Sequence, residues 1–152
     1  MQRDFSRIAD ALVALGHEVD AYCIIWDGPM PKNMNVHIAP IKAFSNHQRN
    51  ARFATWLKTT FQDKHYDAIV GFNKISGLDV YYAADPCYQD KALTLRHPLY
   101  RLGSRYKQFY QQEKSVFSTK SSTEILMISE VQKPLFQKHY RTPDTRFHLL
   151  PP

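Results

Sequence analysis

Short apolar stretches alternate with amphipathic stretches along the whole chain, and this alternation limits the possible folds more than any other feature. Strands that alternate with helices favour a parallel sheet, because each crossover helix packs back onto a face of that sheet. The sequence therefore predicts an α/β fold, a doubly wound parallel sheet with helices on both faces. The strands are expected at residues 19–26, 35–39, 68–72, 79–84 and 124–128, with a last one in "RFHLLPP".

The helices are indicated by apolar residues spaced three and four positions apart. The first helix is expected between Asp4, placed to cap its start, and Gly16, which suits the position after a helix end. A long helix is expected at about residues 98–117, marked by the spacing of Leu99, Leu102, Tyr106, Phe109 and Val116. The remaining helices are expected at residues 48–62 and 134–140.

The two ends of the chain are unusual for this kind of sheet. A doubly wound domain normally begins with a strand, whereas this chain begins with a helix. In the usual strand order the missing strand would be central, between the strands at 19–26 and 68–72. The chain also ends in "LLPP", where a linker would begin. We therefore expect a domain that is cut at both ends and lacks its first strand.

The composition is that of an ordinary globular protein. At 152 residues and 43% apolar content, the chain is long enough for one domain with a substantial core. No stretch approaches the ~20 apolar residues of a membrane-spanning helix, and no signal peptide is visible at the start. Cys23 and Cys87 form no CxxC pair, so we expect two unpaired thiols in a reducing compartment.

Positive charge is concentrated in two blocks of the sequence, within a net charge of +6. Residues 31–66 carry six bases and one acid, and residues 91–141 carry ten bases and three acids. Such blocks favour an anionic partner: a phosphorylated substrate, a membrane surface or a nucleic acid. The alternative is that both blocks are ordinary solvated helix faces.

Polar residues follow two neighbouring apolar stretches in "GFNKISGLDVYYAAD". Asn73 and Lys74 come after the first expected strand, and Asp85 after the second. Ligands of open α/β sheets bind at the carboxyl ends of the strands, so these residues are candidates for a binding site. The alternatives are that Asp85 is a turn residue before a proline, and that Lys74 is a solvent-facing lysine balancing Asp79.

Six motifs together carry a resemblance to a known family. The chain resembles the lipopolysaccharide core glucosyltransferases, which are bacterial retaining enzymes of the GT-B class with two Rossmann-like domains. In that family glucose is transferred from UDP-glucose to an inner-core heptose. The motifs follow one another in order over nearly the whole chain: "QRDF", "NHQRNARF", "GFNKISGLDVYYAAD", "YRLGSRY", "FQKHY" and "RFHLLPP".

The resemblance implies that residues 1–152 are part of an N-terminal, acceptor-side domain with a Rossmann-like fold. The first strand and a glycine-rich loop of that domain would precede Gln2. The second domain, which holds most of the nucleotide-sugar site, would follow Pro152. The isolated chain is therefore expected not to transfer glucose, although the resemblance makes it part of a retaining hexosyltransferase.

The resemblance also implies roles for individual residues. It places Asp4 beside the glycine-rich loop and Asp85 in the interdomain cleft, and both are expected to be catalytic. Asp4 is alternatively a plain acid of the first helical turn. No metal and no cofactor other than the donor UDP-glucose are expected, because basic groups, mainly of the second domain, would stabilise the leaving UDP. The residues expected to bind substrate are Gln2, Arg3, Asn73 and Lys74.

A membrane-bound acceptor implies a cytoplasmic protein held peripherally at the anionic inner leaflet. The residues expected to form the membrane surface are Lys42, Arg49, Arg52 and Trp56. Trp56 is alternatively a core residue, and a second basic set, Arg101, Arg105 and Lys107, is as well explained by a solvated helix face. The expected partners are thus the lipopolysaccharide inner core and anionic lipid, without nucleic acid.

Two other functions compete with the transferase. One is a non-catalytic basic domain that binds anionic lipid or nucleic acid, although no nucleic-acid-binding motif is present. The other is a small independent α/β enzyme that uses Asp4 and Asp85. The sequence offers neither a phosphate-binding loop nor a nucleophile elbow for it.

Overall fold

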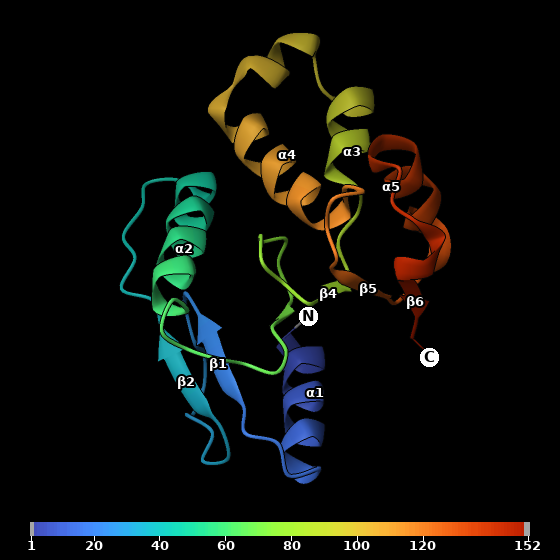
Figure 1. Cartoon of the computed structure of the whole chain (residues 1–152). Helices are drawn as coiled ribbons and strands as arrows, with labels where there is room; N and C mark the ends of the chain where they lie inside the picture. Colours follow the sequence, from blue (N-terminus) through green and yellow to red (C-terminus); the bar gives the residue numbers. More distant parts are fainter. Residues whose placement is uncertain (1, 151–152) are drawn as a thin grey trace. The chain divides into compact units, whose positions relative to one another are not determined.

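All the strands pair in parallel, and they form two sheets (Figure 1). The computed structural model describes residues 2–150, without the side chain of Gln2. The elements, η being 3₁₀ turns, are α1 (Gln2–Ala14), β1 (Asp20–Cys23), β2 (Asn35–Ile38), α2 (Asn46–Thr60), β3 (Val70–Gly71), β4 (Val80–Ala83), α3 (Tyr88–Leu95), η1 (Pro98–Leu102), α4 (Ser104–Phe117), β5 (Glu124–Met127), η2 (Glu130–Gln132), α5 (Lys133–Tyr140), η3 (Asp144–Arg146) and β6 (Phe147–Leu149).

The predicted α/β class and parallel pairing are confirmed, and the parallel strands are divided between two sheets. One sheet has the order β1-β2 and the other β3-β4-β5-β6, so β1 and β3 do not pair with each other. The chain accordingly divides into two compact units, residues 1–65 (unit 1) and 66–152 (unit 2). That a strand preceding Gln2 lies between β1 and β3 stays a prediction.

Unit 1 contains the smaller sheet and the helices α1 and α2. Helix α1 buries Ala9 and ends before Gly16, whose φ of 89° explains why glycine stands there. The helix begins at Gln2, so Asp4 lies in its first turn, and the prediction that Asp4 precedes the helix is wrong. Ser45 caps α2 by accepting a hydrogen bond from the backbone N–H of Gln48.

Unit 2 contains the larger sheet and the main core. Tyr81 of β4 and Ile125 of β5 are fully buried in one core with residues of α4 and α5. Helices α3, α4 and α5 pack side by side (Figure 1). The rings of Phe117 and Phe136 stack at 3.7 Å between centroids, which joins α4 to α5. Aromatic packing of this kind contributes most of the burial that holds a small sheet domain together.

Glycine at position 71 allows the loop between β3 and β4 to pack closely against β3. A Cβ atom at Gly71 would come within 2.3 Å of the Leu78 side chain, which is itself buried. Gly77 has a φ of 84°, which only glycine adopts without strain. Both glycines therefore serve the turn between β3 and β4.

The segment between β4 and β5 differs most from the prediction. Helix α3 was not expected at all, and the expected helix at 98–117 is broken at Gly103 into η1 and α4. Leu99 and Leu102, whose spacing indicated the first part of that helix, lie in η1 and are 67% and 70% exposed. Pro98 starts the 3₁₀ turn, and Gly103 has the extended backbone that separates it from α4.

Candidate functional site

The loops that follow β3 and β4 lie together at the carboxyl ends of the strands of the larger sheet. The two strands are adjacent and parallel, with Val70 opposite Val80 and Gly71 opposite Tyr81, so their carboxyl ends point the same way. Asn73 is exposed in the first loop, and Asp85 is half-buried in the second. This end of the sheet is where parallel α/β sheets bind their ligands.

The carboxylate of Asp85 is available for hydrogen bonding. Within residues 2–150 it makes no hydrogen bond or ion pair. Burial raises the pKa of the neighbouring Tyr81 hydroxyl, and the negative charges of Asp85 and Glu113 raise that pKa further. The Tyr81 hydroxyl itself has no hydrogen-bond partner among the described residues. Asp85 therefore offers a partly enclosed acceptor to an incoming hydroxyl group.

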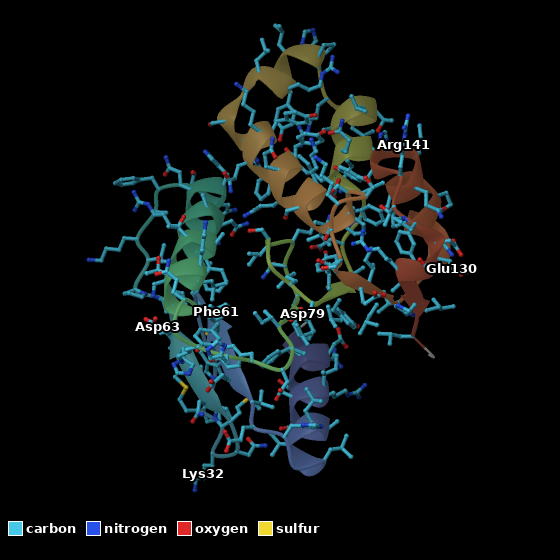
Figure 2. The ribbon with its side chains drawn as sticks, in the orientation of Figure 1. Lys32, Phe61, Asp63, Asp79, Glu130 and Arg141 are labelled. Carbon is cyan, nitrogen blue, oxygen red and sulfur yellow. The ribbon has the colours of Figure 1, made fainter. Side chains whose placement is uncertain are left out.

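Lys74 points inward and not toward solvent. Its Nζ atom lies 2.6 Å from Oε2 of Glu113 and donates a hydrogen bond to the carbonyl of Pro86 at 3.0 Å. The interpretation of Lys74 as a solvent-facing partner of Asp79 is wrong. Asp79, labelled in Figure 2, precedes β4 at the opposite end and accepts a hydrogen bond from the Ile69 N–H. A direct role of Lys74 in substrate binding stays a prediction.

Glu113 of α4 is the centre of a polar cluster that sequence reasoning missed. Its carboxylate is fully buried, and every partner is a donor. A buried carboxylate is tolerated only when such donors replace its water shell, since the desolvation penalty is several kcal/mol. The donors to Oε2 are Lys74 Nζ at 2.6 Å and Tyr88 N at 2.7 Å, and those to Oε1 are Gln89 N at 2.9 Å, the Tyr140 hydroxyl at 2.7 Å and Cys87 Sγ at 3.6 Å.

The two cysteines are unpaired, as the sequence predicted. Burial, together with the charge of Glu113, raises the pKa of the Cys87 thiol to about 12. Burial also raises the pKa of the Cys23 thiol. A thiol nucleophile must ionise near neutral pH, so neither cysteine is a candidate for that role.

The remaining candidate site residues belong to unit 1. Arg3 is exposed and Asp4 is half-buried, both in the first turn of α1, and the side chain of Gln2 lies outside the described part. That Asp4 lies beside a glycine-rich loop, and Asp85 in an interdomain cleft, stays a prediction.

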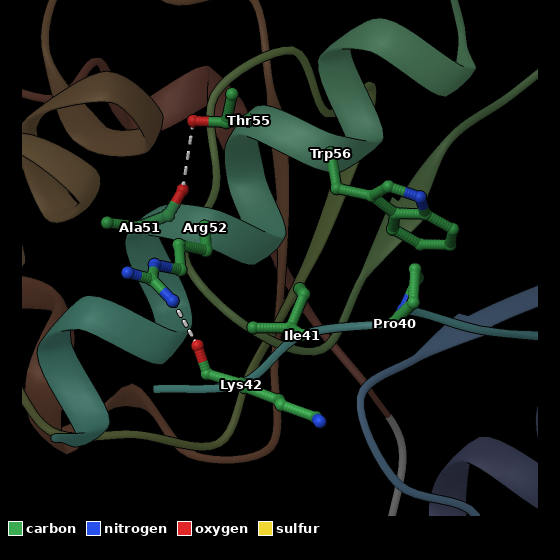
Figure 3. Close-up of a pocket in the computed structure, with 7 residues that line it drawn as sticks. All are labelled: Pro40, Ile41, Lys42, Ala51, Arg52, Thr55 and Trp56. Atoms are coloured by element: carbon green, nitrogen blue, oxygen red, sulfur yellow. Dashed lines mark hydrogen bonds between the residues drawn. The ribbon is translucent and has the colours of Figure 1, made fainter. Parts of the chain in front are cut away.

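An open groove of about 430 Å³ in unit 1 contains three of the four residues expected at the membrane (Figure 3). Lys42, Arg52 and Trp56 line it, and the Arg52 guanidinium donates a hydrogen bond to the Lys42 carbonyl. The Arg49 guanidinium donates a hydrogen bond to Oδ1 of Asn46 at 3.1 Å. Trp56 is half-buried and packs on Phe53 at 5.9 Å, so it belongs partly to the core. Sequence reasoning also missed Phe44, which is fully exposed in the preceding loop.

The second basic set lies on a tip formed by the end of α3, η1 and the start of α4. Arg101, Arg105 and Lys107 are exposed there, together with Arg96. The tip also exposes three large apolar side chains, Leu95, Leu99 and Leu102, at 67–70%. We call residues 95–107 the leucine–arginine tip.

Within residues 2–150, no three or more His, Cys, Asp or Glu side chains gather as a metal site would require. In the same part of the chain, none of the helices has the length and apolar character needed to cross a bilayer.

Comparison with known proteins decides the family. A model described as Glycosyltransferase Family 4 matches residues 1–152. The chain belongs to Glycosyltransferase Family 4. This family 4 chain is 43% identical, over 152 residues, to the lipopolysaccharide glucosyltransferase WaaG of Escherichia coli (strain K12). The resemblance inferred from the six motifs is confirmed.

A solved structure of a related protein has the same fold. The crystal structure of WaaG, a glycosyltransferase involved in lipopolysaccharide biosynthesis, matches 99% of the family 4 chain with a TM-score of 0.96 and 43% identity. The chain spans 41% of the length of each of these two proteins.

Proposed function

We propose that this chain is the acceptor-side part of a lipopolysaccharide glucosyltransferase. The observation that carries the proposal is the 43% identity to such an enzyme, sustained over all 152 residues. The proposed donor is UDP-glucose, and the proposed acceptor is an inner-core heptose of lipopolysaccharide. The transfer is proposed to retain the anomeric configuration, and the protein to work at the cytoplasmic side of the inner membrane without a metal ion.

In the proposed reaction the acceptor hydroxyl oxygen forms a bond to the anomeric carbon of glucose, while the bond from that carbon to the UDP phosphate breaks. A front-face route passes the hydroxyl proton to the leaving phosphate oxygen, so no protein base is required. Asp85 orients the acceptor by accepting hydrogen bonds from its hydroxyl groups, and the Asn73 amide binds beside it. Asp4 is proposed to contact the transferred sugar, and basic groups outside this chain stabilise the leaving UDP.

The experiment that tests this proposal is a transfer assay on a chimera. In the chimera, residues 1–152 replace the matching segment of the E. coli glucosyltransferase, which supplies the remaining parts of the enzyme. The substrates are UDP-glucose and lipopolysaccharide that ends in its inner-core heptose. UDP-galactose serves as the donor control. A purely lipid-binding domain would give a folded chimera that binds the acceptor vesicles and transfers nothing.

Membrane contact through the leucine–arginine tip is the second part of the proposal. Apolar side chains beside basic ones are suited to bind an anionic membrane surface. The apolar side chains insert between the lipid headgroups and the acyl chains, and the basic side chains pair with the anionic headgroups. The other candidate surface is the groove lined by Lys42, Arg52 and Trp56, together with Arg49 of α2 and the exposed Phe44 of the preceding loop. The tip offers three exposed leucines, whereas the groove has one exposed aromatic ring, so we expect the tip to dominate.

Changing Arg96, Arg101 and Arg105 together to glutamine is expected to weaken binding to phosphatidylglycerol-containing vesicles on the order of 100-fold, since each base contributes about 1 kcal/mol. Vesicle co-sedimentation of the chain at low and high salt measures this. The matched control changes Lys42, Arg49 and Arg52 to glutamine and should lose much less. A larger loss in the control, or equal binding to pure phosphatidylcholine vesicles, would contradict the tip assignment.

A further inference from the structure

The Lys74–Glu113 pair joins the two loops that carry the candidate acceptor residues. Lys74 directly follows Asn73, and its ammonium bonds both the Glu113 carboxylate and the carbonyl of Pro86, which directly follows Asp85. A single, largely buried ammonium group therefore links the backbone beside Asn73 to the backbone beside Asp85.

Glu113 also holds the start of α3, which follows the Asp85 loop. It accepts hydrogen bonds from the backbone N–H groups of Tyr88 and Gln89, the first residues of α3. The N-cap residue of this helix, Cys87, makes no side-chain cap, so Glu113 takes the place of a local capping residue. The Asp85–Cys87 turn is thus held from the Pro86 carbonyl on one side and from the start of α3 on the other.

We infer that Lys74 and Glu113 form a positioning pair that sets the distance between Asn73 and Asp85 for the acceptor sugar. The inference rests on the proposed function for the substrate, and on the contacts above for the pair. Lys74 then acts through the two loops, and its ammonium does not touch the substrate. Small displacements of a bound substrate lower rates strongly, so a pair that holds both loops controls transfer from a distance.

The surroundings of Lys74 determine what a substitution at this position removes. The side chain of Lys74 is only 12% exposed, and its ammonium lies 5.9 Å and 5.5 Å from the ring centroids of Phe117 and Phe136. An apolar side chain of similar length fits such surroundings. Removing one partner of a buried ion pair leaves the other charge uncompensated and is strongly destabilising, whereas replacing both partners together is often neutral for stability. A methionine there would keep the packing and lose the directed bonds to Glu113 and Pro86.

The test compares Lys74→Met and Glu113→Gln in the chimera. Both side chains keep their approximate size, and both changes remove the ion pair. The matched control is Lys133→Met, which breaks the Lys133–Asp144 pair, whose Lys Nζ to Asp Oδ1 distance is also 2.6 Å. Two rates are measured: glucose transfer to the heptose acceptor, and the slow hydrolysis of UDP-glucose by water in the absence of acceptor.

The expected result is a fall of about 10- to 100-fold in kcat/KM for the acceptor in both variants, with UDP-glucose hydrolysis changed less than about twofold. Glu113→Asp should recover part of the transfer rate, because it restores the charge. Parallel loss of transfer and hydrolysis would mean that the pair only maintains folding, and unchanged transfer would mean that it has no role; either result overturns the inference.

A measurement on the chain itself separates this inference from the proposed function. Lys74→Met should speed the hydrogen exchange of backbone amides at residues 72–76 and 84–89, and leave exchange in β5 unchanged. A chimera with the natural residues that transfers no glucose refutes the proposed function alone, and the exchange data then decide whether the pair holds the two loops. Unchanged exchange at those residues would overturn the positioning role of the pair, whether or not the chimera transfers glucose.

Discussion

Replacing Asp85 with asparagine is expected to lower kcat/KM for the acceptor in the chimera by about 10- to 100-fold, which corresponds to losing one hydrogen bond to a charged group. The carboxylate is half-buried at the carboxyl end of β4 and makes no hydrogen bond or ion pair within residues 2–150. Nothing in that part of the chain depends on its charge for a contact, so the melting temperature should move by less than about 2 °C.

The matched control for Asp85 is Asp79→Asn at the other end of the same strand. Asp79 is exposed, and its Oδ2 accepts a hydrogen bond from the Ile69 N–H, which the amide oxygen of asparagine can also accept. We expect this control to leave transfer unchanged. If Asp85→Asn kept the natural rate but melted early, Asp85 would be a turn residue before Pro86 and not an acceptor contact.

Replacing Arg146 with methionine is expected to lower the free energy of unfolding by on the order of 3 kcal/mol. Arg146 is buried, and its guanidinium donates hydrogen bonds to the carbonyls of Val116, Ser118 and Thr123 at 2.5–2.9 Å. Two of these carbonyls lie at the end of α4 and one just before β5. Methionine fills much of the space but leaves these carbonyls without a donor.

Urea denaturation of the chain measures this effect, with Arg101→Met as its control. Arg101 is exposed in η1, and a surface change of this kind costs less than about 0.5 kcal/mol. A loss of less than about 1 kcal/mol for Arg146→Met would mean that water satisfies the three carbonyls and that Arg146 does not tie α4 to β5.

The parts of the fold that could be predicted are those with local signals. The first helix was predicted from its apolar spacing, and its end from Gly16, which adopts the positive φ that glycine permits. The parallel strands were predicted from short apolar runs between helices. Their lengths were overestimated, since β3 contains only Val70 and Gly71 where five residues had been expected. Apolar character continues past the last paired residue, so sequence cannot mark where pairing stops.

Helix α3 could not be predicted because its start has no local signal. Its capping carboxylate belongs to Glu113, 25 residues from the Tyr88 amide that it binds. Ala92 is the only buried residue of α3, so the helix presents only a narrow face to the core. Leu99 and Leu102 had the opposite effect on the prediction. Their spacing suits a buried helix face, and yet both are exposed.

The position of the candidate site was predictable, whereas its internal bonding was not. Asn73 and Asp85 lie at strand ends, and the rule for parallel sheets brings such residues to one edge. The Lys74–Glu113 contact joins residues 39 positions apart, and a glutamate within a polar helical stretch gives no sign that it is buried. Only the packing of α4 against α3 and α5 places that carboxylate inside the core.

The measurement that tests the central claim most directly is the mass of the lipopolysaccharide made by the purified chimera from UDP-glucose. The proposed function predicts that the heptose-terminated acceptor gains the mass of one hexose, at a rate within about tenfold of the E. coli enzyme, whose catalysis should fall in the common range of 1 to 1,000 per second. A chimera that is folded by circular dichroism, and leaves the acceptor mass unchanged under conditions in which the E. coli enzyme converts it fully, would contradict the assignment of this chain to a lipopolysaccharide glucosyltransferase.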